Sequence, residues 1–96
     1  MHVISRKRLN EFVARHPDSR PSITNWYRIV KQETFASFAD LKLSFPSADR
    51  VGKFTVFNIS GNKFRLIAAI HYNRRKIYVR SVLTHSDYDL GDWKES

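Results

Sequence analysis

The first third of the chain carries apolar residues at helical spacing. Leu9, Phe12 and Val13 recur at three- and four-residue intervals, and Ser5 ahead of them is a residue type that caps helices. Pro17 ends this helix because it lacks a backbone donor. A second helix opens at residues 21–22, and its stripe follows i, i+3, i+4, i+7 spacing. That stripe consists of Ile23, Trp26, Tyr27 and Val30.

From residue 53 the apolar period changes to two, which is typical of half-buried strands. Strands are predicted over residues 53–60, 63–72 and 76–83, separated by two-residue turns at 61–62 and 73–74. Residues 2–4 form a possible first strand, 37–46 hold a third short helical segment, 46–52 form a loop, and the tail is a turn or one helical turn. The pattern predicts an α+β domain with two N-terminal helices on one face of a mostly antiparallel sheet of three to four strands.

The two turns fix a register that identifies the buried face. Ile59 should face Phe64, and Ile70 should face Ile77. The other pairs expected on this face are Phe57–Leu66, Thr55–Ala68, Ala68–Val79, Leu66–Ser81 and Phe64–Leu83. Both hairpins place mostly apolar residues there, so we expect this face to pack on the helices.

The opposite face gathers polar side chains at one end. In the same register Arg65 lies opposite both Asn58 and Val82, Arg80 is diagonal to Arg65, and Lys63 and Thr84 occupy the next row. The side chains expected to converge are Asn58, Lys63, Arg65, Arg80, His85 and Tyr88. The far end is apolar and needs a cover, either the tail or a partner.

The net charge of the chain bears on what it binds. The chain of 96 residues has 17 Lys and Arg against nine Asp and Glu, a net charge of +8. Such a balance indicates an acidic partner, with nucleic acid ahead of an anionic membrane or an acidic protein, or else it serves solubility alone. The chain has no cysteine and neither a signal-like segment nor an apolar span of about 20 residues. We expect one cytoplasmic domain over residues 1–96 that does not insert into membranes.

Arg65 and Arg80 are like charges on neighbouring strands, and residues 53–83 contain no carboxylate. They either bind phosphate through their guanidinium forks or pair with aspartates of the tail. His85 is either a general acid or base or a cap of the tail, and Tyr88 either contacts a base or pins the tail. Lys63 is either a phosphate contact or a solvated turn residue.

The sequence lacks the motifs of several common enzyme chemistries. The chain has no P-loop, no GxGxxG, no HExxH and no acidic cluster for two-metal cleavage. We expect no cofactor and no metal. Metal-free cleavage of RNA needs only a base, an acid and cations, because the 2′-hydroxyl attacks its own phosphate.

Two segments, VFNISGNKFRLIAAI and IYVRSVLTHSDYD, closely resemble the HigB-type toxins, a branch of the RelE-like ribonucleases of bacterial toxin–antitoxin systems. The order and spacing of these segments carry the resemblance, which covers essentially the whole chain. It implies the RelE-like microbial RNase fold and an endoribonuclease, an mRNA interferase, that cuts translated mRNA in the ribosomal A site. It also implies a cognate helix-turn-helix antitoxin of the HigA type.

The resemblance also implies roles for single residues. Arg65 in FRL matches the arginine that contacts the scissile phosphate, and His85 matches a catalytic position that RelE fills with a basic residue. Tyr88 matches the late tyrosine that stacks on or deprotonates the substrate, and Arg80 is a phosphate partner by the register. RelE carries lysines on the strand before its equivalent segment, where this chain offers Asn58 and Thr55, with Lys53 only at the start. The candidates for the general base are Lys53, Lys63, Tyr88 and His85.

Two other functions fit the same basic face. A non-catalytic RNA-binding module would bind the backbone with an affinity that falls steeply with salt. A protein-binding domain would dock an acidic partner. The chain lacks both an RRM-like pattern of exposed aromatic residues and a KH-type GxxG loop.

Overall fold

Five strands form one sheet in the order β1-β5-β4-β3-β2, in a computed structural model that describes residues 1–95. The strands are β1 (His2–Ile4), β2 (Asp49–Val51), β3 (Phe54–Ile59), β4 (Phe64–His71) and β5 (Lys76–Thr84). The helices are α1 (Arg6–Arg15), α2 (Arg20–Gln32), α3 (Phe38–Ser44) and α4 (His85–Leu90), with 3-10 turns η1 (Pro17–Ser19), η2 (Tyr72–Arg74) and η3 (Asp92–Glu95). Among these five strands β1 and β5 pair in parallel, and the other neighbours pair antiparallel. The α+β class is confirmed, with five strands instead of three to four.

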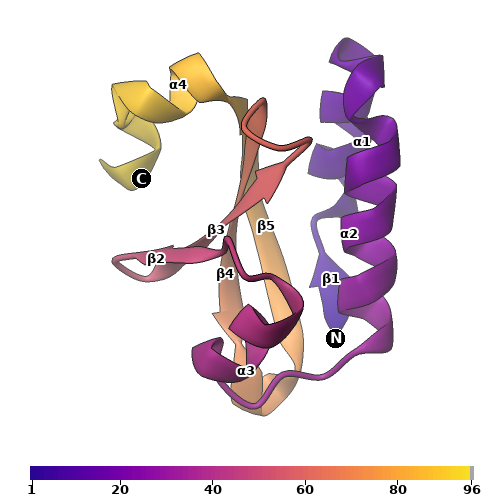
Figure 1. Ribbon diagram of the computed structural model, residues 1–96, viewed down its shortest axis with the longest axis vertical. Coiled ribbons are helices and arrows are strands. Elements are labelled where there is room, and N and C mark those ends of the chain that lie inside the picture. The colour runs from indigo at the N-terminus through magenta and orange to yellow at the C-terminus, as the bar shows by residue number, and fades with distance from the viewer. Residues whose placement is uncertain (96) are drawn as a thin grey trace.

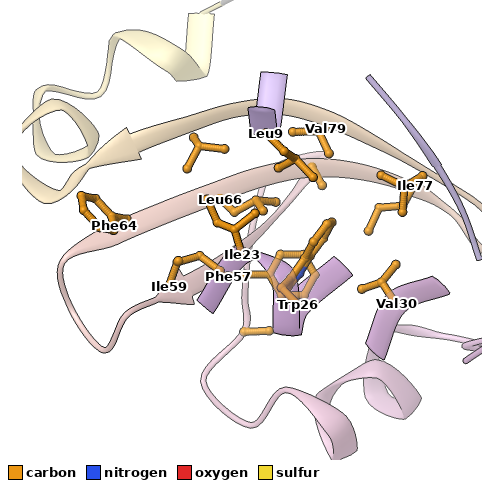
Figure 2. Close-up of a cluster of buried hydrophobic side chains, with 14 of the residues drawn as sticks. Leu9, Ile23, Trp26, Val30, Phe57, Ile59, Phe64, Leu66, Ile77 and Val79 are labelled. Atoms are coloured by element: carbon orange, nitrogen blue, oxygen red, sulfur yellow. The ribbon is translucent and has the colours of Figure 1, made fainter. Parts of the chain in front are cut away.

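The sheet separates two layers. Figure 1 shows α1 and α2 against one face, whereas α4 and the C-terminal tail lie on the other. The main core fills the space between the helices and the sheet, where Trp26 of α2 meets Phe57 of β3 edge to face at 5.4 Å between ring centroids (Figure 2). The sheet face opposite α1 and α2, the open face, carries a smaller cluster. It joins Phe54, Val56 and Ile67 to Trp93 of the tail. The tail therefore covers the apolar end of this face.

The predicted register is confirmed up to the middle of the second hairpin. The observed pairs that match it are Ile59–Phe64, Phe57–Leu66, Thr55–Ala68, Ile70–Ile77 and Ala68–Val79. Both turns are centred as predicted, since the amide of Lys63 donates to the Ser60 carbonyl and the amide of Arg75 to the Tyr72 carbonyl. Beyond Ala68 the pairing shifts, and Ile67 pairs with Ser81. Arg80 is thus the extra residue of a β-bulge.

The bulge makes the rest of the predicted register wrong. Val82 was expected on the open face but is 7% exposed and belongs to the main core, paired with Leu66. Ser81 and Leu83 were expected on the core face, but Leu83 pairs with Arg65 and packs against the open-face cluster. A shift of one residue exchanges the two faces of a strand, which explains why all these side chains change together.

Three local predictions also need correction. Residues 46–52 are not all loop, because Asp49–Val51 adds β2 to the sheet edge. The tail forms both α4 and η3, more than one helical turn. Ser5 precedes α1, but it has a left-handed backbone with φ of 72° and its side chain makes no capping hydrogen bond. Among the described residues, no helix is both long and apolar enough to cross a membrane.

Candidate RNA-cleaving site

The open face carries a group of polar side chains where β4 meets α4. Arg65 of β4 pairs with Asn58 of β3 on one side and with Leu83 of β5 on the other. β5 turns directly into α4 because Thr84 caps the helix, its Oγ1 accepting from the amide of Asp87 at 3.2 Å. α4 therefore begins beside the row that holds Arg65.

The guanidinium of Arg65 is held by hydrogen bonds but pairs with no carboxylate among the described residues. Nη1 donates to the Phe64 carbonyl at 3.1 Å and Nη2 lies 3.4 Å from Oδ1 of Asn62. Its Cζ lies 5.5 Å from the centroid of the Tyr88 ring, a cation–π distance. Within residues 1–95 the ion pairs are Lys63–Asp18 and His85–Asp89, so neither Arg65 nor Arg80 pairs with an aspartate of the tail.

His85, the first residue of α4, contacts Asp89 one turn later. Its Nε2 lies 3.2 Å from Oδ2 of Asp89, and the two side chains are 48% and 63% exposed. Sequence reasoning treated Asp89 as a partner for the arginines and missed this pair, although the i, i+4 spacing on a helix is a signal for it. The exposed imidazole has a carboxylate on one side and open solvent for a substrate.

Tyr88 lies between Arg65 and Trp93. The rings of Tyr88 and Trp93 are stacked, with 5.1 Å between centroids and 16° between planes. The indole Nε1 of Trp93 donates to the Tyr88 carbonyl at 3.0 Å. The sequence named the tail as one possible cover for the apolar end of this face, but no pattern in the tail singled out Trp93 as the residue that provides it.

Other predicted site residues are held differently. Nζ of Lys63 binds Oδ2 of Asp18 in η1 at 2.6 Å, and this hydrogen bond holds the pKa of Asp18 below its ordinary value. Lys53 precedes β3 at the opposite end from Asn58, about 16 Å along the strand. The hydroxyl of Thr84 serves as the helix cap.

The bulge also changes the position of Arg80. It no longer lies diagonal to Arg65, because Leu83 and Ser81 pair with residues 65 and 67 and Arg80 falls beyond them. Its backbone carbonyl accepts a hydrogen bond of 2.8 Å from Nη1 of Arg8 in α1.

The chemistry available at this site is anion binding and proton transfer. Arg65 supplies a fork of donors, His85 an imidazole and Tyr88 a phenol, all within β4 and α4. Over residues 1–95 there is no group of three or more His, Cys, Asp or Glu placed to hold a metal ion. This combination of side chains suits a phosphodiester substrate.

Comparison with known proteins gives one family. A model of the HigB toxin family, the RelE-like toxic component of a toxin–antitoxin system, matches residues 19–91. The mRNA interferase toxin HigB of Escherichia coli K12 is 32% identical over 93 residues, which cover 94% of this chain and 89% of that protein. An mRNA interferase HigB of Shigella flexneri gives the same values, and one of Escherichia coli O6:H1 is 27% identical over 92 residues, 93% of this chain and 89% of its own. The matched region contains β2–β5 and α4, and with them the whole polar group.

Proposed function

We propose a mechanism from the premise that this chain belongs to the HigB family of RelE-like toxins, whose members named above are mRNA interferases. It is the toxin of a toxin–antitoxin system and an endoribonuclease. We propose further that it cuts mRNA during translation, in the ribosomal A site, and thereby inhibits protein synthesis. The observation that carries the mechanism is the contact of the Arg65 guanidinium with Tyr88, one helical turn from His85.

Arg65 is proposed to bind the scissile phosphate. Its guanidinium has no carboxylate partner among the described residues, and a planar fork of donors matches two phosphate oxygens. Charge grows on these oxygens as the 2′-oxygen attacks, so the same contact stabilises the transition state more than the ground state. Arg80 and Asn58 are proposed as outer contacts to the RNA backbone, since they lie on flanking strands. Lys63 can join them only by leaving Asp18.

His85 and Tyr88 are proposed to move the two protons of the reaction. The 2′-oxygen forms a bond to phosphorus as its proton goes to a base, and the bond from phosphorus to the 5′-oxygen breaks as that oxygen takes a proton from an acid. The products are a 2′,3′-cyclic phosphate and a 5′-hydroxyl. We assign the acid to His85, because its imidazole is exposed and, with Nε2 beside Asp89, Nδ1 can give a proton to the leaving oxygen. We assign the base to Tyr88, whose phenol lies beside a cation. Lys53 is too far along β3 for that task.

The ribosome and an antitoxin complete the proposal. The site is an open face rather than a deep cleft, so the ribosome would have to hold the mRNA in line for attack. Membership in a toxin–antitoxin family implies an antitoxin partner, and we propose a helix-turn-helix protein of the HigA type. The net charge of +8 suits both rRNA and an acidic inhibitor.

The chemistry of the RNA ends tests this mechanism. Purified protein would be added to a reconstituted translation reaction in which an mRNA is being read, and to the same mRNA alone. We expect cuts only during translation, with 2′,3′-cyclic phosphate and 5′-hydroxyl ends. Fragments that carry 5′-phosphates would contradict attack by the 2′-hydroxyl, and equal cutting of the free mRNA would contradict dependence on the ribosome.

A further inference from the structure

α4 is too short to hold its own position. Its six residues are all described, and none of them is buried, whereas helices below about 12 residues are marginal on their own in water. Its beginning is tied to the sheet, because Thr84 caps it and the amide of His85 donates to the Lys63 carbonyl at 3.1 Å. Tyr88 lies in its second half, so the phenol needs another anchor.

Trp93 supplies that anchor from η3. Its side chain stacks on the Tyr88 ring, and its Nε1 donates to the Tyr88 carbonyl at 3.0 Å. The same carbonyl accepts from the amide of Gly91 at 3.1 Å, and Gly91 has a left-handed backbone with φ of 79° that turns the chain back toward the sheet. One side chain therefore fixes both the ring and the backbone of Tyr88.

Trp93 is itself held by the sheet. It is 7% exposed and belongs to the open-face cluster, where its ring meets Phe54 edge to face at 6.2 Å between centroids. The contacts run from Phe54 of β3 through Trp93 and Tyr88 to Arg65 of β4. The phenol is thus tied at both ends to strands, which are the rigid part of the fold.

We propose that Trp93 is a positioning residue of the RNA-cleaving site, which sets the Tyr88 ring against Arg65 and so fixes the phenol relative to the scissile phosphate. This inference rests on the proposed role of Tyr88. Burial leaves Trp93 almost no surface for RNA, so it acts through Tyr88 rather than by contact. Misplacing a reacting group by about 1 Å costs about 10²-fold in rate. Trp93→Ala should therefore lower kcat by about that factor, with KM changed only a few-fold.

The experiment measures kcat and KM for mRNA cleavage in the translation reaction, with thermal unfolding of each variant alongside. Trp93→Phe keeps an aromatic ring and should recover most of the rate. Asp92→Asn, an exposed neighbour in η3, is the matched control and should cleave like wild type. Tyr88→Ala and the double variant Tyr88→Ala with Trp93→Ala complete a cycle. We expect no further loss from Trp93→Ala when Tyr88 is already absent.

Each contrary outcome has a distinct meaning. Losses that multiply in the double variant would show that Trp93 acts independently of Tyr88 and would overturn the inference. A wild-type rate for Trp93→Ala beside an inactive Tyr88→Ala would overturn the inference and leave the proposed function intact. A wild-type rate for Tyr88→Ala would overturn the role of Tyr88 itself. If Trp93→Ala does not fold, the cycle is run with Trp93→Leu, which keeps apolar bulk without a ring.

Discussion

The guanidinium of Arg65 on β4 lies over the ring of Tyr88 on α4, with 5.5 Å between Cζ and the ring centroid. The contact joins a strand to a helix that begins one strand later in the chain. It keeps a cation next to a phenol on an open face, where a phosphate can reach both.

Arg65→Ala should slow mRNA cleavage by about 10²–10³-fold, the usual cost of one lost donor to a developing anion. Arg65→Lys should recover only part of the rate, because lysine keeps the charge but not the bidentate fork. Rates in the translation reaction, with circular dichroism as a check of folding, measure this. Arg74→Ala in the turn after β4 is the matched control. An Arg65→Ala variant as fast as Arg74→Ala would remove Arg65 from the site.

His85→Ala should slow mRNA cleavage much more than Asp89→Asn. Loss of the proposed acid costs about 10²–10⁴-fold. Asp89 is 63% exposed, so its interaction with the imidazole is screened by solvent and its loss should cost less than about fivefold. Cleavage rates of both variants decide this, with Asp87→Asn on the same helix as control. If Asp89→Asn were as slow as His85→Ala, the carboxylate would be part of the proton-transfer machinery.

The Lys63–Asp18 pair should contribute to stability in a pH-dependent way. The Lys63 hydrogen bond lowers the pKa of Asp18 below its ordinary value of 3.8. Its stabilising contribution is therefore fully present above that value and is lost as the pH falls through the lower, folded-state pKa. Thermal melts of wild type and Asp18→Asn should show a small gap in Tm at pH 7, because the pair is exposed.

The same gap should narrow as the pH falls below 3.8 and close once the pH lies below the lowered, folded-state pKa of Asp18, where both states bind the proton. Glu11→Gln, an exposed acid on α1, controls for the loss of one negative charge. A gap in Tm that persists unchanged in acid would mean that Asp18 stabilises the fold by something other than its charge.

Because of the bulge, we expect β5 to tolerate the deletion of Arg80. Arg80 is the extra residue between Val79 and Ser81, so removing it leaves regular alternation on β5. Removing Tyr78 instead would turn Val79 away from the core and place Arg80 in its position, even if the bulge absorbs the shift beyond it. We expect the Arg80 deletion to unfold cooperatively and the Tyr78 deletion to lose its cooperative transition, as followed by thermal melts. Equal damage from both deletions would contradict the register.

Local sequence signals were enough for the parts of the fold that depend on neighbours in the chain. The stripe through Trp26 and the turns at 61–62 and 73–74 each follow from side chains a few residues apart. The bulge at Arg80 carries no glycine or proline to mark it, and it arises where β5 must satisfy both β4 and the Arg8 contact. β2 has only three residues, too few to show a period.

The candidate site shows the same difference between residues placed by local signals and residues placed by long-range contacts. Arg65 and Asn58 were placed correctly opposite each other, because the first hairpin sets their register. The position of Tyr88 depends on contacts from Trp93 to β3 and to the Tyr88 ring, which no local pattern encodes. His85 is instead held at the start of α4, where its amide donates to the Lys63 carbonyl. Lys63 was assigned to the polar group from its row in the sheet, but an aspartate of η1, far away in sequence, binds it.

The most direct test of the central claim is a primer-extension map of a translated reporter mRNA after brief induction of the protein. His85→Ala and a reporter without its start codon run beside it. We expect cuts in the reading frame that disappear in both controls. An intact transcript in the presence of folded protein, or cuts that survive in His85→Ala, would contradict it.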